Sequence, residues 1–294
     1  MRTVTYSGLL TARSSVAHGG RVTGTTANFR RETLMMPDGS PLAGVPVVSG
    51  GVIRGEIRRV ASILFQSALT EGLDERRLPF HVVHAFRTGG SLTETRTKGE
   101  AITGAKQGTL RSLIPLIGVF GVAGGGRIMS GRLIVDKAIP LAQETAWLQD
   151  KVSADSLPSI WKLIQREQYS RVADVEDASA APYVIREDGD VLPPGSGQML
   201  WFQDALVAGS RLMHSVTLED GTDAEAAFLE DVLAMWSRKA HIGGGKARGH
   251  GWVTPEYVKT ETNCWGDPVP SVTHDWRAEV QANRDEIMAA LAWL

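Results

Sequence analysis

Apolar and polar side chains alternate over the first ten residues, with Val4, Tyr6 and Leu10 on one phase. A period of two predicts a half-buried β-strand. From residue 13 to residue 49 the alternation is lost, and Gly, Ser, Thr, Pro and Arg dominate. Compact domains seldom contain so long a loop without a functional reason, so we expect this segment to be a loop that holds a ligand.

Helical spacing begins after this segment. The apolar positions that follow it are Ile53, Ile57, Val60, Ala61, Leu64 and Ala68. They predict an amphipathic helix that starts at the Gly50-Gly51 pair. Residues 84–112 are polar, glycine-containing and basic, which predicts an exposed insertion.

The middle of the chain alternates short apolar runs with glycine and proline. Residues 112–122 are apolar, residues 124–126 predict a turn, and residues 132–139 predict a strand. Residues 141–197 hold a short helix around Trp161, followed by a stretch rich in Asp, Ala, Pro and Gly. We interpret residues 141–197 as a second insertion rather than core.

The C-terminal part predicts a strand, a helix, a strand and a last helix. Residues 212–218 alternate most regularly. Thr222 and Glu225 have capping-box spacing at the start of the next helix. The apolar stripe of that helix is Leu229, Val232, Leu233 and Trp236. Residues 249–258 predict a strand, and the last helix is marked by Trp276, Val280, Ile287 and Leu291.

These elements follow the order βαββαβ. That order predicts an α+β protein with an RRM-like, ferredoxin-like sheet, in one domain over residues 1–294 with the two insertions. Such a sheet often binds RNA, but a fold alone does not assign a function.

Charge is segregated along the chain, although the net charge is only −2. Residues 1–60 carry eight arginines against three acids, and residues 236–259 carry five basic residues against one acid. Residues 140–235 hold seventeen acids against six bases. The basic ends could bind phosphates while the acidic middle contacts another copy of the chain; alternatively, the acids merely keep the middle segment soluble.

The sequence predicts a cytoplasmic protein without a metal or a cofactor. Cys264 is the single cysteine, so it can form no internal disulfide and no zinc cluster. The N-terminus lacks the apolar region of a signal peptide, and no apolar run is long enough to span a membrane. His81 and His84 lack a third ligand, and no GxSxG elbow accompanies Ser14 or Ser15.

Residues 47–59 form the strongest candidate motif. Gly50 and Gly51 precede a helix, where main-chain N–H groups and the helix dipole favour an anion. Arg54 and Arg58 lie one turn apart outside the predicted apolar face, so both could reach the same stretch of phosphates. The alternative is an ordinary helix with solvated arginines.

A second motif contains five glycines between residues 243 and 251. Consecutive N–H groups at Gly244 and Gly245 could form an anion-binding nest, with charge from Lys246 and Arg248. His250 could donate a hydrogen bond or stack. The order of a P-loop is absent, so this is no ATP site. The alternative is a flexible connection between a helix and a strand.

Together these motifs resemble the RAMP superfamily, specifically the backbone subunits of CRISPR effector complexes, most like type IV and next most like type III. The family's segment P-x-I-P-G-S-S-L-K-G-x-x-R is similar to residues 45–58, with Arg54-Gly55 in place of Lys-Gly. The family's glycine-rich loop looks like residues 243–253. Weaker similarity lies at residues 120–121 with 132–138, and at residues 191–195 before 199–206.

The resemblance implies an RRM-like palm, a β-hairpin thumb that displaces a guide base, and head-to-tail stacking of copies along a guide crRNA. The thumb is expected within residues 165–197, with residues 84–112 as the other candidate. The expected RNA contacts are His18, Arg21, Ser49, Gly50, Gly51, Arg54, Arg58, Gly244, Gly245, Lys246, Arg248 and His250. A complementary target nucleic acid, further copies of the chain and other CRISPR subunits are the expected partners, without a membrane.

One departure from the family concerns catalysis. Target-cleaving type III members carry an aspartate in the loop after the first strand, shortly after a glycine pair, whereas residues 19–32 contain no Asp. We therefore expect no enzymatic activity. The alternative is a RAMP-type ribonuclease that cuts RNA at regular spacing with Glu32, His18 or Asp38. A third hypothesis is an RRM-like RNA binder outside CRISPR systems.

Overall fold

The computed structural model describes residues 1–90, 102–124, 127–149, 152–171, 199–271 and 273–294. Its centre is an antiparallel sheet in which β14 pairs with β1, β1 with β13, and β13 with both β9 and β10. The strands of this central sheet are β1 (Arg2–Ala12), β9 (Leu133–Val135), β10 (Ile139–Pro140), β13 (Arg211–Gly221) and β14 (Val253–Thr262).

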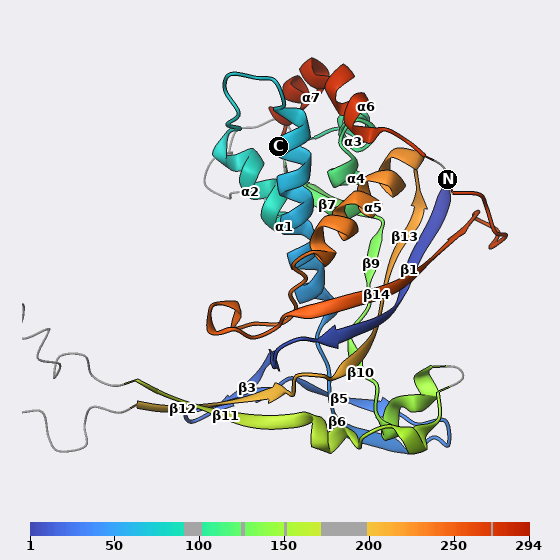
Figure 1. The fold of residues 1–294 in the computed structure, drawn as a ribbon. Coiled ribbons are helices and arrows are strands. Elements are labelled where there is room, and N and C mark those ends of the chain that lie inside the picture. The colour runs from blue at the N-terminus through green and yellow to red at the C-terminus, as the bar shows by residue number, and fades with distance from the viewer. Residues whose placement is uncertain (91–101, 125–126, 150–151, 172–198, 272) are drawn as a thin grey trace, which may run out of the picture.

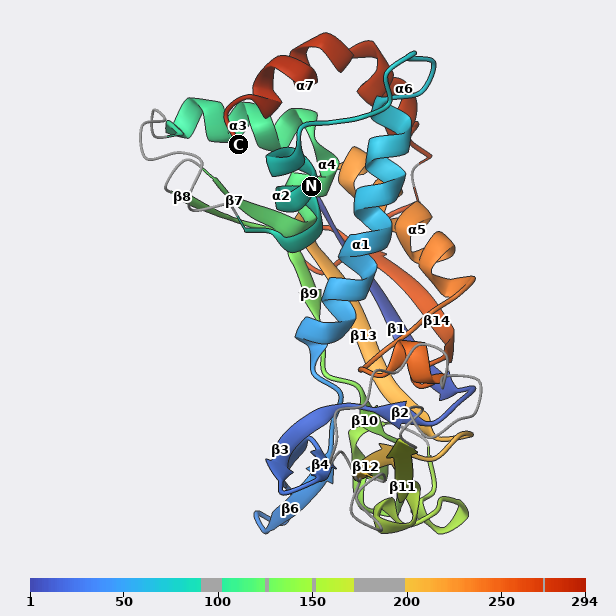
Figure 2. The ribbon, with the colours of Figure 1, turned by 90° about the vertical axis from the view of Figure 1, so that its left-hand side faces the viewer.

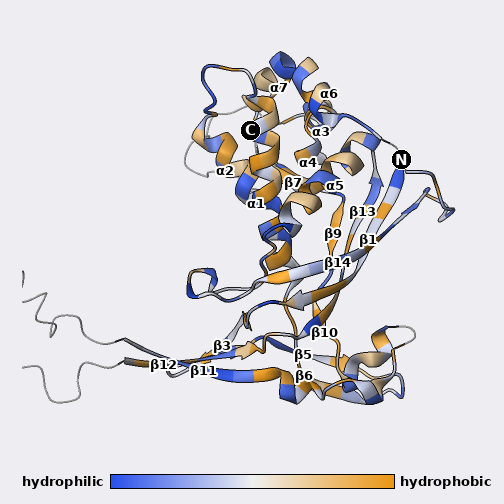
Figure 3. Cartoon of the chain, in the orientation of Figure 1, coloured by the Kyte–Doolittle hydropathy of each residue, from blue (hydrophilic) through white to orange (hydrophobic). Residues whose placement is uncertain are grey.

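Helices cover one face of the central sheet (Figures 1 and 2). They are α1 (Gly50–Leu69), α2 (Phe80–Thr88), α3 (Gly104–Leu113), α4 (Pro115–Phe120), α5 (Asp223–Ser237), α6 (Trp276–Ala282) and α7 (Arg284–Leu291). The alternation of β1 explains this arrangement, because Val4, Tyr6 and Leu10 are buried in the core shared with the helices. Both α1 and α5 contain hydrophobic residues (Figure 3), and Ile53, Ile57, Leu229 and Trp236 are among their buried positions.

The predicted capping box at the start of α5 is confirmed. The Thr222 side chain accepts a hydrogen bond from the Glu225 N–H at 3.2 Å, and Glu225 Oε2 accepts one from the Thr222 N–H at 2.8 Å. These two bonds satisfy main-chain donors that the first turn of a helix otherwise leaves unpaired. The stripe that includes Leu229 and Trp236 is buried, as expected.

The core elements run β1, α1, β9, β13, α5, β14 along the chain. Across the sheet the order is β14, β1, β13, β9. This is the βαββαβ arrangement of a ferredoxin-like palm, so the predicted α+β fold class is confirmed.

A second sheet lies beneath the central one, where the sequence predicted a loop (Figure 1). Its strands are β2 (Val16–Ala17), β3 (Gly19–Thr23), β4 (Thr26–Phe29), β11 (Ile164–Arg171) and β12 (Met199–Leu206). A hairpin of β5 (Arg31–Met35) and β6 (Pro41–Pro46) follows β4. The prediction of a loop over residues 13–49 is therefore wrong. Within this segment β3 pairs with β4 and β5 pairs with β6, while β2 and β4 also pair with β12, which is far away in the chain.

Residues 84–112, where an exposed insertion was predicted, contain the end of α2 and most of α3, with Ala85, Phe86, Ile102 and Leu110 buried. Helix α2 buries Val82 and Phe86 against α1, and α3 buries Leu110 in the main core. The hairpin of β7 (Gly121–Gly124) and β8 (Arg127–Ser130) follows α4. Residues 91–101 lie outside the described part of the chain.

The region from residue 141 onward begins with three 3₁₀-helices: Gln143–Leu148, Ala154–Ser156 and Ile160–Leu163. The last of these contains Trp161, where a short helix was predicted. Strands β11 and β12 then form an antiparallel pair that flanks residues 172–198. The predicted thumb, within residues 165–197, falls partly on β11 and partly outside the described residues.

The predicted final helix is two helices, with α6 ending and α7 beginning around Asn283. The Asn283 side chain donates a hydrogen bond to the Glu279 carbonyl at 3.0 Å, which caps the end of α6. No helix among the described residues is long and apolar enough to cross a membrane.

A buried histidine makes the stability of the palm dependent on pH. His214 is 5% exposed, its Nδ1 lies 2.7 Å from Tyr257 Oη, and burial lowers its pKa to about 4. The unfolded chain binds this proton near pH 6.5, so the contribution of His214 is present above about pH 6.5 and is lost as pH falls toward about 4. We expect the free energy of unfolding to fall by about 2 kcal/mol between about pH 7 and about pH 5.

Urea unfolding of the parent and of His214→Asn at both pH values checks this expectation. The fall should be clearly smaller in the variant. An equal fall in both proteins would assign the pH dependence to other groups.

Candidate nucleic-acid interface

The glycine-rich loop at residues 243–251 packs directly on the main chain that follows β1. Gly243 has φ of +75°, and a Cβ there would lie 2.2 Å from the Ala17 carbonyl oxygen. Gly251 has φ of +87°, and its Cβ would lie 2.2 Å from the Ile242 carbonyl oxygen. The Gly244 N–H donates to the Ala17 carbonyl at 2.7 Å. Gly243 and Gly251 are therefore required because other main-chain atoms approach them closely, and not only because they are flexible.

Lys246 and Arg248 lie on the outside of this loop, in the 3₁₀-helix Lys246–Arg248, and both are exposed. The Lys246 ammonium lies 6.0 Å from the centre of the Trp252 ring. The Arg248 guanidinium lies 5.0 Å from the centre of the Tyr169 ring and donates to Gln203 Oε1 at 2.7 Å. The loop thus combines exposed positive charge with aromatic side chains, as single-stranded nucleic-acid sites do.

His250 anchors the loop instead of facing solvent, which corrects the expectation of a stacking surface. It is 2% exposed. Its Nδ1 lies 2.9 Å from Ser15 Oγ, and its Nε2 lies 2.5 Å from Tyr169 Oη. Tyr169 Oη donates to Glu167 Oε2 at 2.7 Å. Both ring nitrogens of His250 therefore have hydrogen-bond partners.

Tyr169 also connects the loop to the hairpin of β11 and β12. Burial and the neighbouring Glu167 raise the pKa of Tyr169 to about 12, so it remains a hydrogen-bond donor at neutral pH. Its partner across the hairpin is Trp201, which is 47% exposed. The base of the predicted thumb and the glycine-rich loop therefore form one continuous surface.

The first helix begins beside this surface. Ser49 is the N-cap of α1, and its N–H donates to His18 Nε2 at 3.2 Å. Gly50 is buried, and a Cβ there would lie 2.0 Å from the Val135 carbonyl oxygen. Gly51 is exposed, with open space around its Cα. The helix dipole is uncompensated at this end, because the first turn contains no acidic residue.

Residues 17 and 18 join the two glycine motifs that were predicted separately. Ala17 forms a bridge with Gly244, while the next residue, His18, contacts the N-terminus of α1. His18 is 8% exposed, and its burial and the nearby Arg30 lower its pKa. The imidazole is therefore neutral at pH 7 and acts as an acceptor, so its role is to position Ser49.

The sequence predicted that Arg58 lies outside the apolar face of α1, but the structure buries this side chain. It is 6% exposed and donates to the carbonyls of Phe86, Ala85, Phe120 and Gly121 at 2.7, 3.0, 3.1 and 2.8 Å. Burial and the nearby Arg54 lower the pKa of Arg58 to about 10, which leaves it charged at neutral pH.

Arg54 is directed the same way, toward the carbonyls of Phe120 and Leu133. Burial lowers its pKa. The structure therefore gives Arg54 and Arg58 a role in joining helices, and we leave both out of the interface.

Arg21 lies on β3, away from the two glycine motifs, in a hollow formed with Arg30, Arg31 and Arg166. The last three arginines were not predicted from the sequence, nor were Tyr169, Trp201 and Trp252. The signal was weak, because these residues are spread over strands whose pairing depends on distant segments.

The two carboxylates of the alternative ribonuclease site, Glu32 and Asp38, already have partners within the protein. Glu32 Oε2 lies 2.5 Å from Lys137 Nζ, and Glu32 Oε1 lies 3.1 Å from Arg30 Nη2. The Lys137 hydrogen bond is the main reason that the pKa of Glu32 is lowered. Asp38 accepts from its neighbour Ser40 in the turn between β5 and β6. Among the described residues, no group of three or more His, Cys, Asp or Glu could hold a metal ion.

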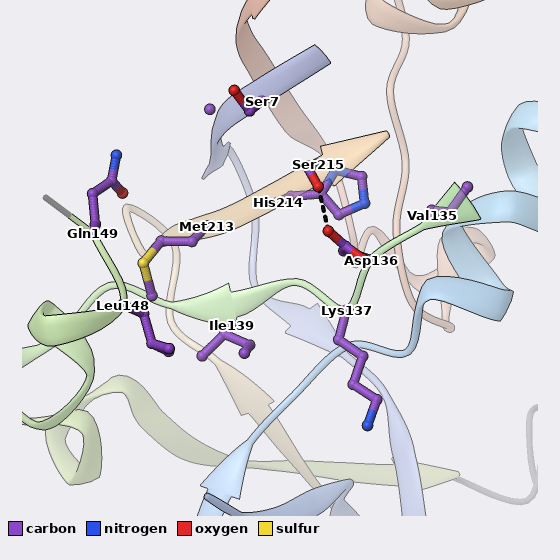
Figure 4. Close-up of a pocket in the computed structure, with 11 residues that line it drawn as sticks. Ser7, Val135, Asp136, Lys137, Ile139, Leu148, Gln149, Met213, His214 and Ser215 are labelled. Carbon is purple, nitrogen blue, oxygen red and sulfur yellow. Dashed lines mark hydrogen bonds between the residues drawn. The ribbon is translucent and has the colours of Figure 1, made fainter. Parts of the chain in front are cut away.

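A further hollow of about 780 Å³ lies on the face of the central sheet opposite the helices (Figure 4). In this hollow Asp136 accepts a hydrogen bond from Ser215, and Lys137 is the positively charged residue of the lining. The remaining lining is uncharged at neutral pH, since His214 has a lowered pKa. One acid and one base give no preference for phosphate, so this hollow is not part of the interface.

Comparison with known proteins fits this arrangement. A family model for the RAMP superfamily matches residues 43–254, which run from β6 into β14 and include both glycine motifs. Among solved structures, the chain is similar to a chain of a type IV-B CRISPR complex, with 28% identity and a TM-score of 0.55. The alignment covers 94% of this chain and 97% of that chain. No curated protein sequence matches. Because the family model covers well over half of the chain, the protein belongs to the RAMP superfamily.

Proposed function

We propose that the protein is a guide-RNA-binding backbone subunit of a CRISPR effector ribonucleoprotein, which assembles head to tail along crRNA without cutting it. The observation that carries this proposal is the surface made by the glycine-rich loop, the base of the β11 and β12 hairpin and the N-terminus of α1. The likeness to a chain of a type IV-B CRISPR complex over nearly its whole length supports the same assignment.

The proposed surface binds the backbone of the RNA without reading its sequence. Lys246 and Arg248 pair with phosphates, and Trp201 offers a face on which any base can stack. The open N-terminus of α1 at Gly51 adds main-chain donors and a partial positive charge. Such contacts suit a subunit that must accept every guide sequence.

Copies of the chain, a complementary target strand and other CRISPR subunits complete the proposed assembly. The hairpin of β11 and β12 is the proposed thumb. The sequence carries an excess of acids at residues 140–235 and of bases towards its two ends, and such opposite charges favour head-to-tail contact over contact between like ends.

Purification from cells that express a guide tests the proposal. We expect a large RNA-containing oligomer whose mass grows with guide length, and whose RNA binding falls steeply with salt because phosphate contacts release counterions. Light scattering and the RNA content of the particle measure both properties. A salt-insensitive monomer free of RNA would show that the protein is not such a subunit.

The purified complex is not expected to cut complementary RNA. The Glu32 carboxylate is bound by Lys137 and Arg30, and its lowered pKa makes it a weak proton acceptor. Labelled target is incubated with guide-loaded complex and Mg²⁺, with Glu32→Ala and Asp38→Ala beside the parent. Intact target in all three supports the proposal. Regularly spaced fragments that vanish in Glu32→Ala would establish the ribonuclease instead.

A further inference from the structure

The hairpin of β11 and β12 has a second face, opposite the one that touches the glycine-rich loop. Glu167 and Tyr169 face the loop through their contacts with His250. Because side chains alternate along a strand, Arg166 points the other way, where it pairs with Asp204 across the hairpin. The features on this second face are therefore separate from the proposed guide-binding surface.

Two adjoining hollows occupy the second face, with volumes of about 370 and 540 Å³. Both are lined by Arg31, Arg166 and Asp204, so they form one groove. Trp161 lies at one end of this groove, and Arg21 and Arg30 lie at the other. We call it the arginine groove.

The charge of the arginine groove is strongly positive. Among the described residues, four arginines and one carboxylate line it, and this carboxylate, Asp204, is 5% exposed and bound by Arg166 Nε at 2.9 Å. Arg30 pairs with Glu32. No hydrogen bond or ion pair to another described residue involves the guanidinium of Arg21 or of Arg31. Two exposed arginines thus keep all their N–H donors for a ligand.

An aromatic platform stands beside these cations. Trp161 is 49% exposed. It lies against Gly44, where φ is +77° and a Cβ would be 3.6 Å from two carbons of the indole and 3.9 Å from Arg31 Nη1. The indole and the Arg31 guanidinium therefore both lie close to the same point of β6, where the positive φ favours glycine. An exposed indole next to a free guanidinium offers a stacking surface and a phosphate ligand within the span of one nucleotide.

We propose that the arginine groove is a second binding site for single-stranded nucleic acid, in which Trp161 stacks a base and Arg21 and Arg31 hold phosphates. This inference rests on the proposed function, and it adds a site on the other side of the thumb base. An acidic protein segment would pair with the arginines but would leave the half-exposed indole of Trp161 without a stacking partner. A nucleic-acid strand engages both.

The test compares Arg21→Gln/Arg31→Gln and Trp161→Leu with the parent in the assembled protein, using a labelled single-stranded RNA that carries photoreactive thiouridine. Arg76→Gln/Arg77→Gln and Trp265→Leu are matched controls, since these residues are exposed and belong to the segments after α1 and after β14, which lie away from the second sheet (Figure 1). Removal of two phosphate contacts should lower the slope of log K against log salt by about 1.4. Crosslinks should map to Trp161 and disappear in Trp161→Leu.

Each other outcome overturns the proposal. If the parent binds RNA but the arginine variant keeps its salt slope and no crosslink maps to Trp161, the groove fails while the proposed function stands. If the variants lose oligomer mass with RNA affinity unchanged, the groove contacts protein. If the parent binds no RNA, the proposed function fails as well.

Discussion

Replacing Lys246 and Arg248 together by Ala is expected to weaken RNA binding roughly 10-fold at about 0.15 M salt, and equally for RNAs of different sequence. Both side chains are exposed on the glycine-rich loop, and neither contributes to the core. Phosphate contacts of a single strand release about 0.7 counterion each, so the slope of log K against log salt should fall by about 1.4. Titration with two unrelated RNAs over a range of salt measures both effects.

The matched control is Arg76→Ala/Arg77→Ala, which removes the same charge from the loop that follows α1. That loop lies at the other end of α1 from the glycine-rich loop (Figure 1). The control should leave affinity within about twofold of the parent, because distant charges are screened at this salt. Equal losses in both variants would indicate a general charge effect, and a loss confined to one RNA would indicate base reading. Either result would reject phosphate binding at the glycine-rich loop.

The parts of the fold that follow local rules could be predicted from the sequence. The strand at residues 212–218 is indicated by its own alternation, and the helix after Thr222 by a capping box whose two residues lie three positions apart, so both could be recognised locally. The short strands between residues 16 and 46 are different. Thr26 pairs with Phe202 and Val16 pairs with Leu206, so part of the pairing of β2 and β4 depends on a segment far away in the chain.

The same distinction holds within the candidate interface. The glycines at 243–251 could be singled out because their number exceeds what a turn requires, and the structure shows which close contacts require them. The burial of His250 could not be predicted, because its partners Ser15 and Tyr169 come from segments far away in the sequence. Two motifs that looked independent meet only because residues 17 and 18 lie between them.

Arg58 shows that helical spacing alone does not predict whether a charged side chain is exposed. Its replacement gives the second large expected effect. Replacing Arg58 by Met should lower the free energy of unfolding by about 3 kcal/mol. The change removes hydrogen bonds to four buried carbonyls, which join α1 to the ends of α2 and α4. Two of those carbonyls belong to Phe86 and Phe120, whose loosening would also disturb the packing around Phe65.

Arg59→Met is the matched control, since the Arg59 side chain is 63% exposed and pairs with Glu56 in the same helix. Its loss should cost less than about 0.5 kcal/mol. Urea unfolding of both variants measures the difference, and RNA titration under conditions where both stay folded separates structure from binding. We expect Arg58→Met to keep its RNA affinity, because its guanidinium points into the core. A stable Arg58→Met protein with weakened RNA binding would return Arg58 to the phosphate-binding role that the sequence motif suggested.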